Sequence, residues 1–296
     1  MERVLISGAS GLIGSALARS LERAGVAVMR LVRGTPRNPN EIALEPAEGL
    51  ARGAVSGFDA VIHLAGESIV GRWSEAKKKK IRESRVQGTA NVASALAAAE
   101  IKPKVFVCAS AVGFYGDRGD EVLTERSASG EGFLAEVARE WEAAAQVAAD
   151  AGIRTVNLRT GLVLSASGGA LAKMLPPFQF GLGGRLGSGR QWWSWIHIDD
   201  VVGAIDHVMS TPGVSGPVNL VAPNAVRNKE FTKELALTLH RPALVPVPAF
   251  ALELAFGHLA AHELFLSSVR AVPEKLVNNG YNFRFPDLPG ALKNLV

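Results

Sequence analysis

The first fourteen residues constrain the fold more than any other stretch of the chain. An apolar run typical of a strand, Val4-Leu5-Ile6-Ser7, precedes Gly8, Gly11 and Gly14, and a segment with helical spacing follows. A strand, a glycine turn and a helix in this order bring free backbone N–H groups to the carboxyl end of the strand. Gly8 would permit the tight turn, Gly11 the close approach of phosphates, and Gly14 the packing of helix on strand. We therefore predict a turn that binds the pyrophosphate of a dinucleotide.

Further apolar segments alternate with helical segments along the first half of the chain. Strands are expected at 26–32, 58–66, 105–109 and 154–159, and a helix at about 132–150. This alternation predicts an α/β fold with a doubly wound parallel sheet of the Rossmann type. Residues 34–56 are polar and proline-punctuated, and we expect a loop there. We assign 1–163 to the nucleotide-binding domain, which a helix near 199–210 rejoins, and 164–296 to a smaller C-terminal lobe on the substrate side.

The composition is that of a globular protein, with 48% hydrophobic and 20% charged residues. The balance of 32 basic to 28 acidic residues predicts no nucleic-acid partner. The lysines at 77–80 share a short segment with Glu75 and Glu83, which favours a solvated helix face over a nucleic-acid patch. No apolar run reaches the roughly 18 residues that a membrane span needs, and we find no signal sequence. The single Cys108 lies in an apolar run, which indicates a buried thiol. We expect a cytoplasmic protein without membrane partners, and its oligomeric state stays open.

The second predicted strand carries the residues that select between the two nicotinamide dinucleotides. An Asp or Glu about 20 residues past the glycines usually bonds the ribose of NAD. Between Arg23 and Asn40 the chain has no acidic residue, and it has Arg30, Arg33 and Arg37 instead. Because an arginine in this place pairs with a 2′-phosphate, we predict NADP(H) as the cofactor. Arg33, at the strand's end, is the best candidate, whereas Arg30 is equally well explained as a solvated side chain.

Two histidines lie within apolar runs. His63 is inside a predicted strand and His197 lies between two isoleucines, so packing in the core is the favoured interpretation of both. Asp199 or Asp200 is expected to cap a helix that begins at Val201.

The middle of the chain contains a glycine-rich stretch, 181–189, and three nearby tryptophans, Trp192, Trp193 and Trp195. Loops of this composition often cover a cleft. We expect a lid over the nicotinamide end of the site. The alternative, that the tryptophans join the two lobes, stays open.

Several motifs together are specific to one superfamily. They are Ser7-Gly8-x-x-Gly11-x-x-Gly14, His63-Leu64-Ala65-Gly66, Gly88-Thr89-x-Asn91 and Phe114-Tyr115-Gly116-Asp117. With them the chain resembles the extended short-chain dehydrogenase/reductases, which include nucleotide-sugar epimerases and dehydratases. It is most similar to the epimerase-family subgroup typified by the atypical short-chain member 39U. The matching residues are Leu64-Ala65-Gly66-Glu67, Ser84-Arg85, Trp141-Glu142, Met174-Leu175-Pro176-Pro177-Phe178, Gly181-Leu182-Gly183-Gly184 and Trp195-Ile196-His197-Ile198-Asp199-Asp200.

This resemblance covers nearly the whole chain and implies NADP(H) binding. It extends to residues of about 245–293, which resemble that subgroup's C-terminal domain of unknown function. Arg33 would meet the 2′-phosphate. The other residues that it implies at the cofactor are Gly8, Ser10, Gly11, Leu12, Ile13, Gly14, Leu64, Ala65, Gly66, Arg85 and Val163. We assign no metal ligands and name no substrate.

The superfamily's usual catalytic pair, Tyr-x-x-x-Lys, is absent. In that pair the lysine lowers the pKa of the phenol, and the tyrosine then exchanges a proton with the substrate. Alignment on Trp141-Glu142 puts Leu134 and Ala138 at the two positions, and residues 116–172 contain neither tyrosine nor lysine. The usual serine is replaced by Ala111.

Three functions therefore stay open. The first is an NADP(H)-dependent oxidoreductase or epimerase with an altered proton donor, for which Tyr115, Ser110 and His197 are candidates. The second is a protein that binds or senses NADP(H) without turnover, and the third is a structural protein with a vestigial cofactor fold. The intact glycines and Arg33 count against the third. A packing role for Tyr115 is as well supported as a catalytic one.

Overall fold

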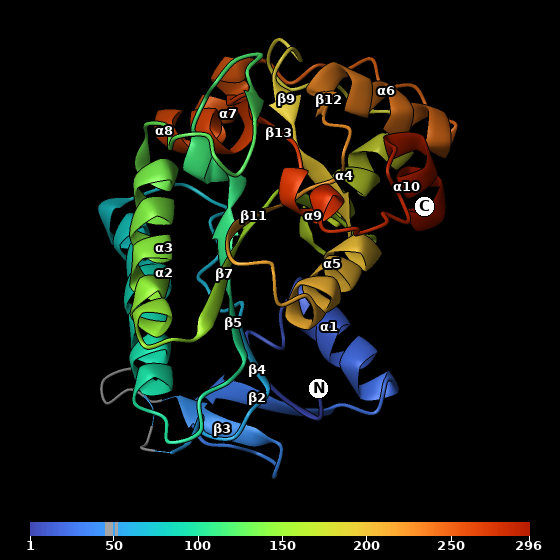
Figure 1. Ribbon diagram of the computed structural model, residues 1–296. Helices are drawn as coiled ribbons and strands as arrows, with labels where there is room; N and C mark the ends of the chain where they lie inside the picture. Colours follow the sequence, from blue (N-terminus) through green and yellow to red (C-terminus); the bar gives the residue numbers. More distant parts are fainter. Residues whose placement is uncertain (45–49, 51–52) are drawn as a thin grey trace.

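A seven-stranded sheet forms the centre of the molecule, in the order β11-β7-β5-β4-β1-β2-β3 (Figure 1). The computed structural model describes residues 1–44, 50 and 53–296. All neighbouring strands run parallel, which confirms the doubly wound α/β fold. The strand order reverses between β1 and β4, and ligands of such sheets bind at this switch point. The strands are β1 Arg3–Ser7, β2 Ala27–Arg33, β3 Glu41–Leu44, β4 Ala60–His63, β5 Val105–Ala111, β7 Arg154–Thr160 and β11 Gly216–Leu220.

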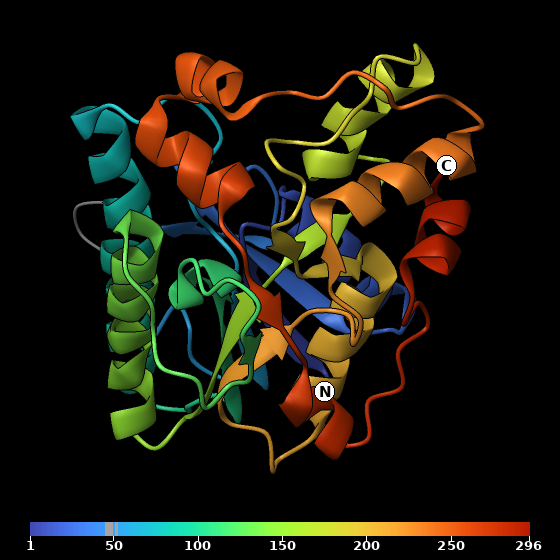
Figure 2. The ribbon, with the colours of Figure 1, turned by 90° about the horizontal axis from the view of Figure 1, so that it is seen from above.

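Helices cover both faces of the sheet, as Figures 1 and 2 show. Helices α1 (Leu12–Arg23) and α5 (Ile198–Ser210) lie on one face, and α2 (Glu75–Ala97) and α3 (Phe133–Asp150) on the other. Side chains alternate across each strand, so Val4 and Ile6 join the core under α1 while Leu5 joins the core under α2 and α3. Burial on both faces explains why these strands read as continuous apolar runs.

Strand β3 corrects the expectation of a loop through residues 34–56. Its four residues pair with β2 from Arg30 to Arg33 at the edge of the sheet. An edge strand needs only one hydrogen-bonding neighbour, so a short segment among prolines and asparagines suffices. Residues 45–49 and 51–52 of the predicted loop lie outside the described residues.

The start of α5 corrects a second expectation. The helix begins at Ile198, and its N-cap is His197, whose Nδ1 accepts a 3.0 Å hydrogen bond from the backbone N–H of Asp199. Neither Asp199 nor Asp200 caps it. The carboxylate of Asp200 is instead occupied by donors from the C-terminal tail, which are Tyr281 Oη and the backbone N–H groups of Arg284 and Phe285. Tertiary contacts therefore override the local capping preference.

Most of the remaining elements lie beyond the carboxyl edge of the sheet, toward the top of Figure 1, and those that follow residue 163 are here called the C-terminal lobe. Because β11 and α5 both follow residue 163 and belong to the sheet and its cover, the chain crosses between the two parts repeatedly. The division at 163 stays a prediction. No helix in the described ranges combines the length and apolar character needed to cross a membrane. The further elements are η1 Val112–Tyr115, β6 Val122–Leu123, β8 Leu162–Leu164, α4 Gly169–Gln179, β9 Trp192–Trp193, β10 Trp195–His197, β12 Val226–Arg227, α6 Asn228–Leu239, α7 Ala249–Phe256, α8 His258–Ala261, the π-helix η2 His262–Leu266, β13 Arg270–Ala271, α9 Glu274–Asn278 and α10 Leu288–Leu295.

Candidate functional site

The turn between β1 and α1 admits only glycine at two of its three glycine positions. Gly8 has a φ of +71°, and a Cβ there would lie 2.8 Å from the backbone nitrogen of Ala65. A Cβ on Gly14 would lie 2.2 Å from the carbonyl oxygen of Gly8. The turn is closed by the N–H of Gly11, which donates a 3.0 Å hydrogen bond to the same oxygen. Strand, turn and helix are therefore as close together as backbones can pack.

The N-terminus of α1 is open toward ligands. Gly11 is its N-cap and has no side chain that could accept the first N–H groups, and the first turn contains no acidic residue. These N–H groups lack partners within the helix, and an anion can supply them.

A cavity of about 250 Å³ borders this turn. Its walls come from the turn, the carboxyl ends of β4, β5 and β7, and the helix α5. Its polar lining residues other than glycine are Ser110 and Thr160, and none of the described residues that line it is titratable. The lining residues are Gly8, Gly11, Leu12, Ile13, Gly14, Leu64, Ala109, Ser110, Leu158, Thr160, Val163, Ile205 and Leu220.

Most of the residues expected at the cofactor lie around this cavity. Beyond those that line it, Ala65 contacts the turn at Gly8 and Ser10 lies exposed within the turn itself. The sequence interpretation missed several wall residues, namely Ala109, Leu158, Thr160, Ile205 and Leu220. Thr160 could have been found, because the carboxyl ends of parallel strands meet at one edge. The apolar ones look like any core residue in the sequence.

Arg33 lies exposed at the end of β2 and makes no ion pair with any described residue. Arg30, three residues earlier in the same strand, is paired with Glu22. The contrast favours Arg33 over Arg30 as the arginine that is open to a ligand.

Arg85 is held on α2 close to the glycine turn region. Its Nη1 donates a 3.0 Å hydrogen bond to the carbonyl oxygen of Glu67, and its guanidinium lies 5.0 Å from the ring centroid of Trp141. Burial lowers the pKa of Arg85 to about 10, so it is still a cation at neutral pH. A Cβ on Gly66 would lie 3.5 Å from this guanidinium. Arg85 and Gly66 therefore lie together, outside the cavity wall.

His63 is buried beneath the turn and pairs with Ser7, whose Oγ lies 2.7 Å from the ring Nδ1. Burial lowers the pKa of His63 to about 4, so the imidazole is neutral. This environment fits the core histidine that its apolar surroundings predict.

Ser110, near the end of β5, is one of the residues that line the cavity. Its Oγ donates a 2.7 Å hydrogen bond to Glu142 on α3. The carboxylate of Glu142 also forms a two-point ion pair with Arg159 on β7, at 2.8 and 2.9 Å. The guanidinium of Arg159 is almost fully buried. The sequence interpretation missed this pair, although two opposite charges in otherwise apolar segments are a detectable signal.

Tyr115 is fully buried and does not line the cavity formed by the described residues. Its hydroxyl lies 2.6 Å from Oδ1 of Asn219 and 3.0 Å from the carbonyl oxygen of Thr124, and it accepts a 3.0 Å hydrogen bond from Arg159. Burial raises the pKa of the phenol. The structure therefore gives Tyr115 a packing position.

Comparison with known proteins shows the family of the chain. The sequence model of the NAD dependent epimerase/dehydratase family matches residues 4–220, and that of a domain of unknown function, DUF1731, matches 247–295. The chain belongs to the NAD dependent epimerase/dehydratase family. It is 42% identical to the epimerase family protein MT2273 of Mycobacterium tuberculosis, over 98% of this chain and 96% of the relative. It is 37% identical to human epimerase family protein SDR39U1, over 99% of each chain. The crystal structure of human SDR39U1 (isoform 2) with NADPH matches it with a TM-score of 0.91 and 35% identity, over 99% of this chain and 98% of that one.

In this member of the family, apolar side chains occupy the positions expected to hold the Tyr and Lys, Leu134 half-buried and Ala138 buried. Leu134 lies at the start of α3 against Gly113, and Ala138 is buried one turn later. The N-terminus of α3 is capped from the DUF1731 region, because the carboxylate of Glu263 accepts the backbone N–H groups of Phe133 and Leu134 at 2.8 and 2.7 Å.

The tryptophans expected in a lid lie elsewhere. Trp195 is fully buried, and Trp193 packs against Phe231 in the same core of the C-terminal lobe. Trp192 pairs through its backbone with β12. The stretch 181–189 is tied by backbone pairing to the segment before α7. None of the three tryptophans lines the cavity of the described residues, so the alternative that they join parts of the structure is the better one.

Proposed function

We propose that this chain binds NADP(H), with the pyrophosphate at the N-terminus of α1 and the 2′-phosphate at Arg33. The observation that carries the proposal is the backbone cradle of Gly8 and Gly14, in which a Cβ would collide with neighbouring backbone, beneath a helix start without a side-chain cap. The NADPH in the structure of the human relative supports the same cofactor. Leu64 and Val163 would border the cofactor inside the cavity, with Arg85 nearby.

We further propose that the chain is an NADP(H)-dependent oxidoreductase or epimerase of a small-molecule substrate. The nicotinamide, when bound, gives or takes hydride. Proton transfer is the difficult part here, because Leu134 and Ala138 replace the usual pair and no titratable side chain is among the described residues of the cavity wall. The hydroxyl hydrogen of Ser110 is already engaged in a hydrogen bond to Glu142, so toward a substrate its oxygen can act only as a hydrogen-bond acceptor. Slow turnover follows, or a substrate that needs little proton assistance.

A second candidate is a protein that holds NADP(H) and senses its redox state without turnover. The mostly apolar cavity wall favours it, because none of the described residues in that wall is titratable. For either candidate we propose a cytoplasmic location, which the buried free thiol of Cys108 supports. Neither candidate requires a nucleic-acid or membrane partner.

Calorimetry with NADPH and NADH on the unmutated protein tests the cofactor. We expect NADPH to bind at least about tenfold tighter, because a charge-assisted phosphate contact contributes about 1.5–3 kcal/mol. Equal affinities, or no binding of either, would overturn the proposal. Oxidation of NADPH with a panel of aldehydes, ketones and sugar nucleotides then separates the two candidates, because only the enzyme turns over.

A further inference from the structure

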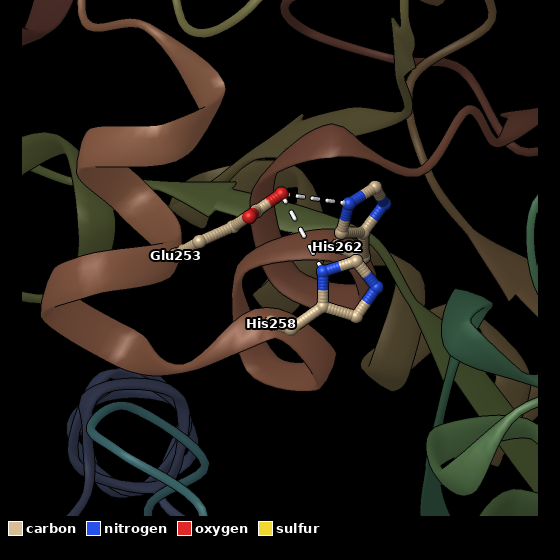
Figure 3. A group of neighbouring side chains, drawn as sticks. All are labelled: Glu253, His258 and His262. Carbon is tan, nitrogen blue, oxygen red and sulfur yellow. Dashed lines mark hydrogen bonds and ion pairs between the residues drawn. The ribbon is translucent and has the colours of Figure 1, made fainter.

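Three side chains of the C-terminal lobe converge on one point far from the glycine turn in the sequence. They are Glu253 on α7, His258 at the start of α8 and His262 at the start of η2 (Figure 3). Oε1 of Glu253 lies 3.1 Å from Nε2 of His262 and 3.5 Å from Nδ1 of His258. One ligand atom from each residue lies within 4.8 Å of the others.

These separations match a metal site. Bonds of about 2.1 Å from zinc to nitrogen or oxygen put the ligand atoms of a tetrahedral site about 3.4 Å apart. The two measured separations from Glu253 bracket that value. The two imidazole rings face one side of the same carboxylate, with centroids 4.4 Å apart. Small rotations of exposed side chains would bring the third pair of ligand atoms into place.

The local backbone explains why the three residues meet. His258 and His262 are four residues apart, which puts two helical side chains on one face. Gly257, with a φ of +82°, turns the chain between α7 and α8 so that Glu253 faces that side. The π-helix η2 begins at His262, and π-turns within helices are frequent at functional sites.

We propose that Glu253, His258 and His262 bind a divalent transition-metal ion, and that Zn²⁺ is the ion that suits them best. Two imidazoles and one carboxylate are a donor set that zinc accepts, and three protein ligands leave a fourth position for water or another ligand. The histidine side chains are 77% and 50% exposed, so an ion can enter from solvent. None of the three residues lines the nucleotide cavity, so this site is separate from the proposed cofactor site.

The bound ion would also stiffen the cap of α3. Glu263 directly follows His262 in η2, and its carboxylate accepts the first N–H groups of α3. An ion that ties His262 to Glu253 on α7 would therefore also restrain its neighbour Glu263, which caps α3. Because the folded chain would bind the ion and the unfolded chain would lack the assembled site, zinc should raise the melting temperature.

Calorimetric titration of the full chain with ZnCl2, after treatment with EDTA and desalting, tests the site. We expect one zinc ion per chain with an affinity in the micromolar range or tighter. His258→Gln and His262→Gln should each weaken zinc binding by at least about tenfold. His240→Asn is the matched control, because His240 is an exposed histidine elsewhere in the lobe and asparagine accepts its left-handed backbone, φ +53°. This control should bind zinc as the unmutated chain does.

A Co²⁺ titration reports the coordination geometry independently, because tetrahedral Co²⁺ absorbs visible light more strongly than octahedral Co²⁺. We expect the strong absorption in the unmutated chain and its loss in the double variant of His258 and His262. NADPH affinity of each variant, which should be unchanged, shows that it is folded. Zinc affinity that is equal in the double variant and the unmutated chain, or no zinc binding by the unmutated chain, would overturn the proposal. Neither result depends on whether NADP(H) turns over.

Discussion

The side-chain hydroxyl of Ser110 donates a 2.7 Å hydrogen bond to Oε1 of Glu142, which joins the cavity wall on β5 to the buried face of α3. The same carboxylate neutralises Arg159, whose side chain is only 4% exposed. A cavity residue and a buried ion pair are thereby parts of one network. A change at Ser110 should affect mainly activity, whereas a change at Glu142 should affect mainly the free energy of unfolding, because only Glu142 neutralises the buried guanidinium.

Glu142→Gln should lower the free energy of unfolding by about 3 kcal/mol or more, because it leaves the guanidinium of Arg159 buried without a countercharge. Glu140→Gln is the control on the same helix. Glu140 pairs with Arg82 at the surface, where both side chains are 40% exposed, and the loss should stay below about 1 kcal/mol. Urea denaturation measures both. Equal losses would show that the Glu142–Arg159 pair does not stabilise the fold as its burial implies.

For any substrate that the chain turns over, Ser110→Ala and Tyr115→Phe should each lower kcat/KM by less than about tenfold. General acid–base help is typically worth about 10²–10⁴-fold, and neither residue has an activating lysine. Tyr115→Phe should still cost about 1–3 kcal/mol of stability, because Asn219 and Arg159 lose a buried partner. Steady-state kinetics and urea denaturation separate the two effects. A roughly thousandfold loss of activity in Tyr115→Phe, with NADPH affinity unchanged, would make Tyr115 the catalytic acid.

Two glycine variants should separate folding from cofactor binding. Gly11 is extended, with φ −75°, and a Cβ there would lie 3.3 Å from the oxygen of Gly8. Gly11→Val should therefore fold at a cost of about 1 kcal/mol and abolish NADPH binding by occupying the space of the phosphates. Gly14→Ala should lower stability by about 3 kcal/mol or more, because its Cβ collides with backbone. Thermal denaturation and calorimetry measure the pair, and normal NADPH affinity in Gly11→Val would contradict the phosphate position.

Arg33→Ala should remove most of the preference for NADPH and leave the affinity for NADH unchanged. The physical reason is the loss of a charge-assisted contact with the 2′-phosphate, worth about 1.5–3 kcal/mol. Arg37→Ala is the control, because Arg37 is also exposed and lies beyond the end of β2. Calorimetry with both cofactors measures the change. A larger effect from Arg37→Ala would move the phosphate contact to that arginine.

Stability should fall as the pH drops from about 6.5 to about 4. Burial lowers the pKa of His63 from its ordinary value of 6.5 to about 4, so the unfolded chain takes up a proton first as the pH falls. The stabilisation is fully present above pH 6.5, and its loss at pH 4 amounts to about 3 kcal/mol. His63→Asn should flatten this part of the pH profile in urea denaturation. A profile as steep as that of the unmutated chain would assign the effect to another group.

Local sequence patterns predicted much of the fold. Five strands of the sheet, the glycine turn and the helix α3 were expected within a few residues of their bounds, because each depends on side-chain periodicity within one segment. The family resemblance implied a Tyr-x-x-x-Lys pair, and its absence was visible in the sequence because residues 116–172 contain neither tyrosine nor lysine. Strand β3 was not predicted, because an edge strand needs little apolar character and so leaves no clear pattern in the sequence.

The sequence by itself determined the strand, glycine turn and helix that form the proposed cofactor cradle, because a Cβ on Gly14 would collide with backbone of the same local segment, at Gly8. The collision at Gly8 is with Ala65, which only the tertiary structure brings next to the turn. Only the tertiary structure decided where the polar side chains went. Ser110 meets Glu142 across 32 residues of sequence, and Glu263 meets Phe133 across 130. A carboxylate or hydroxyl binds whichever donor or acceptor folding brings to it, and sequence spacing does not encode that choice.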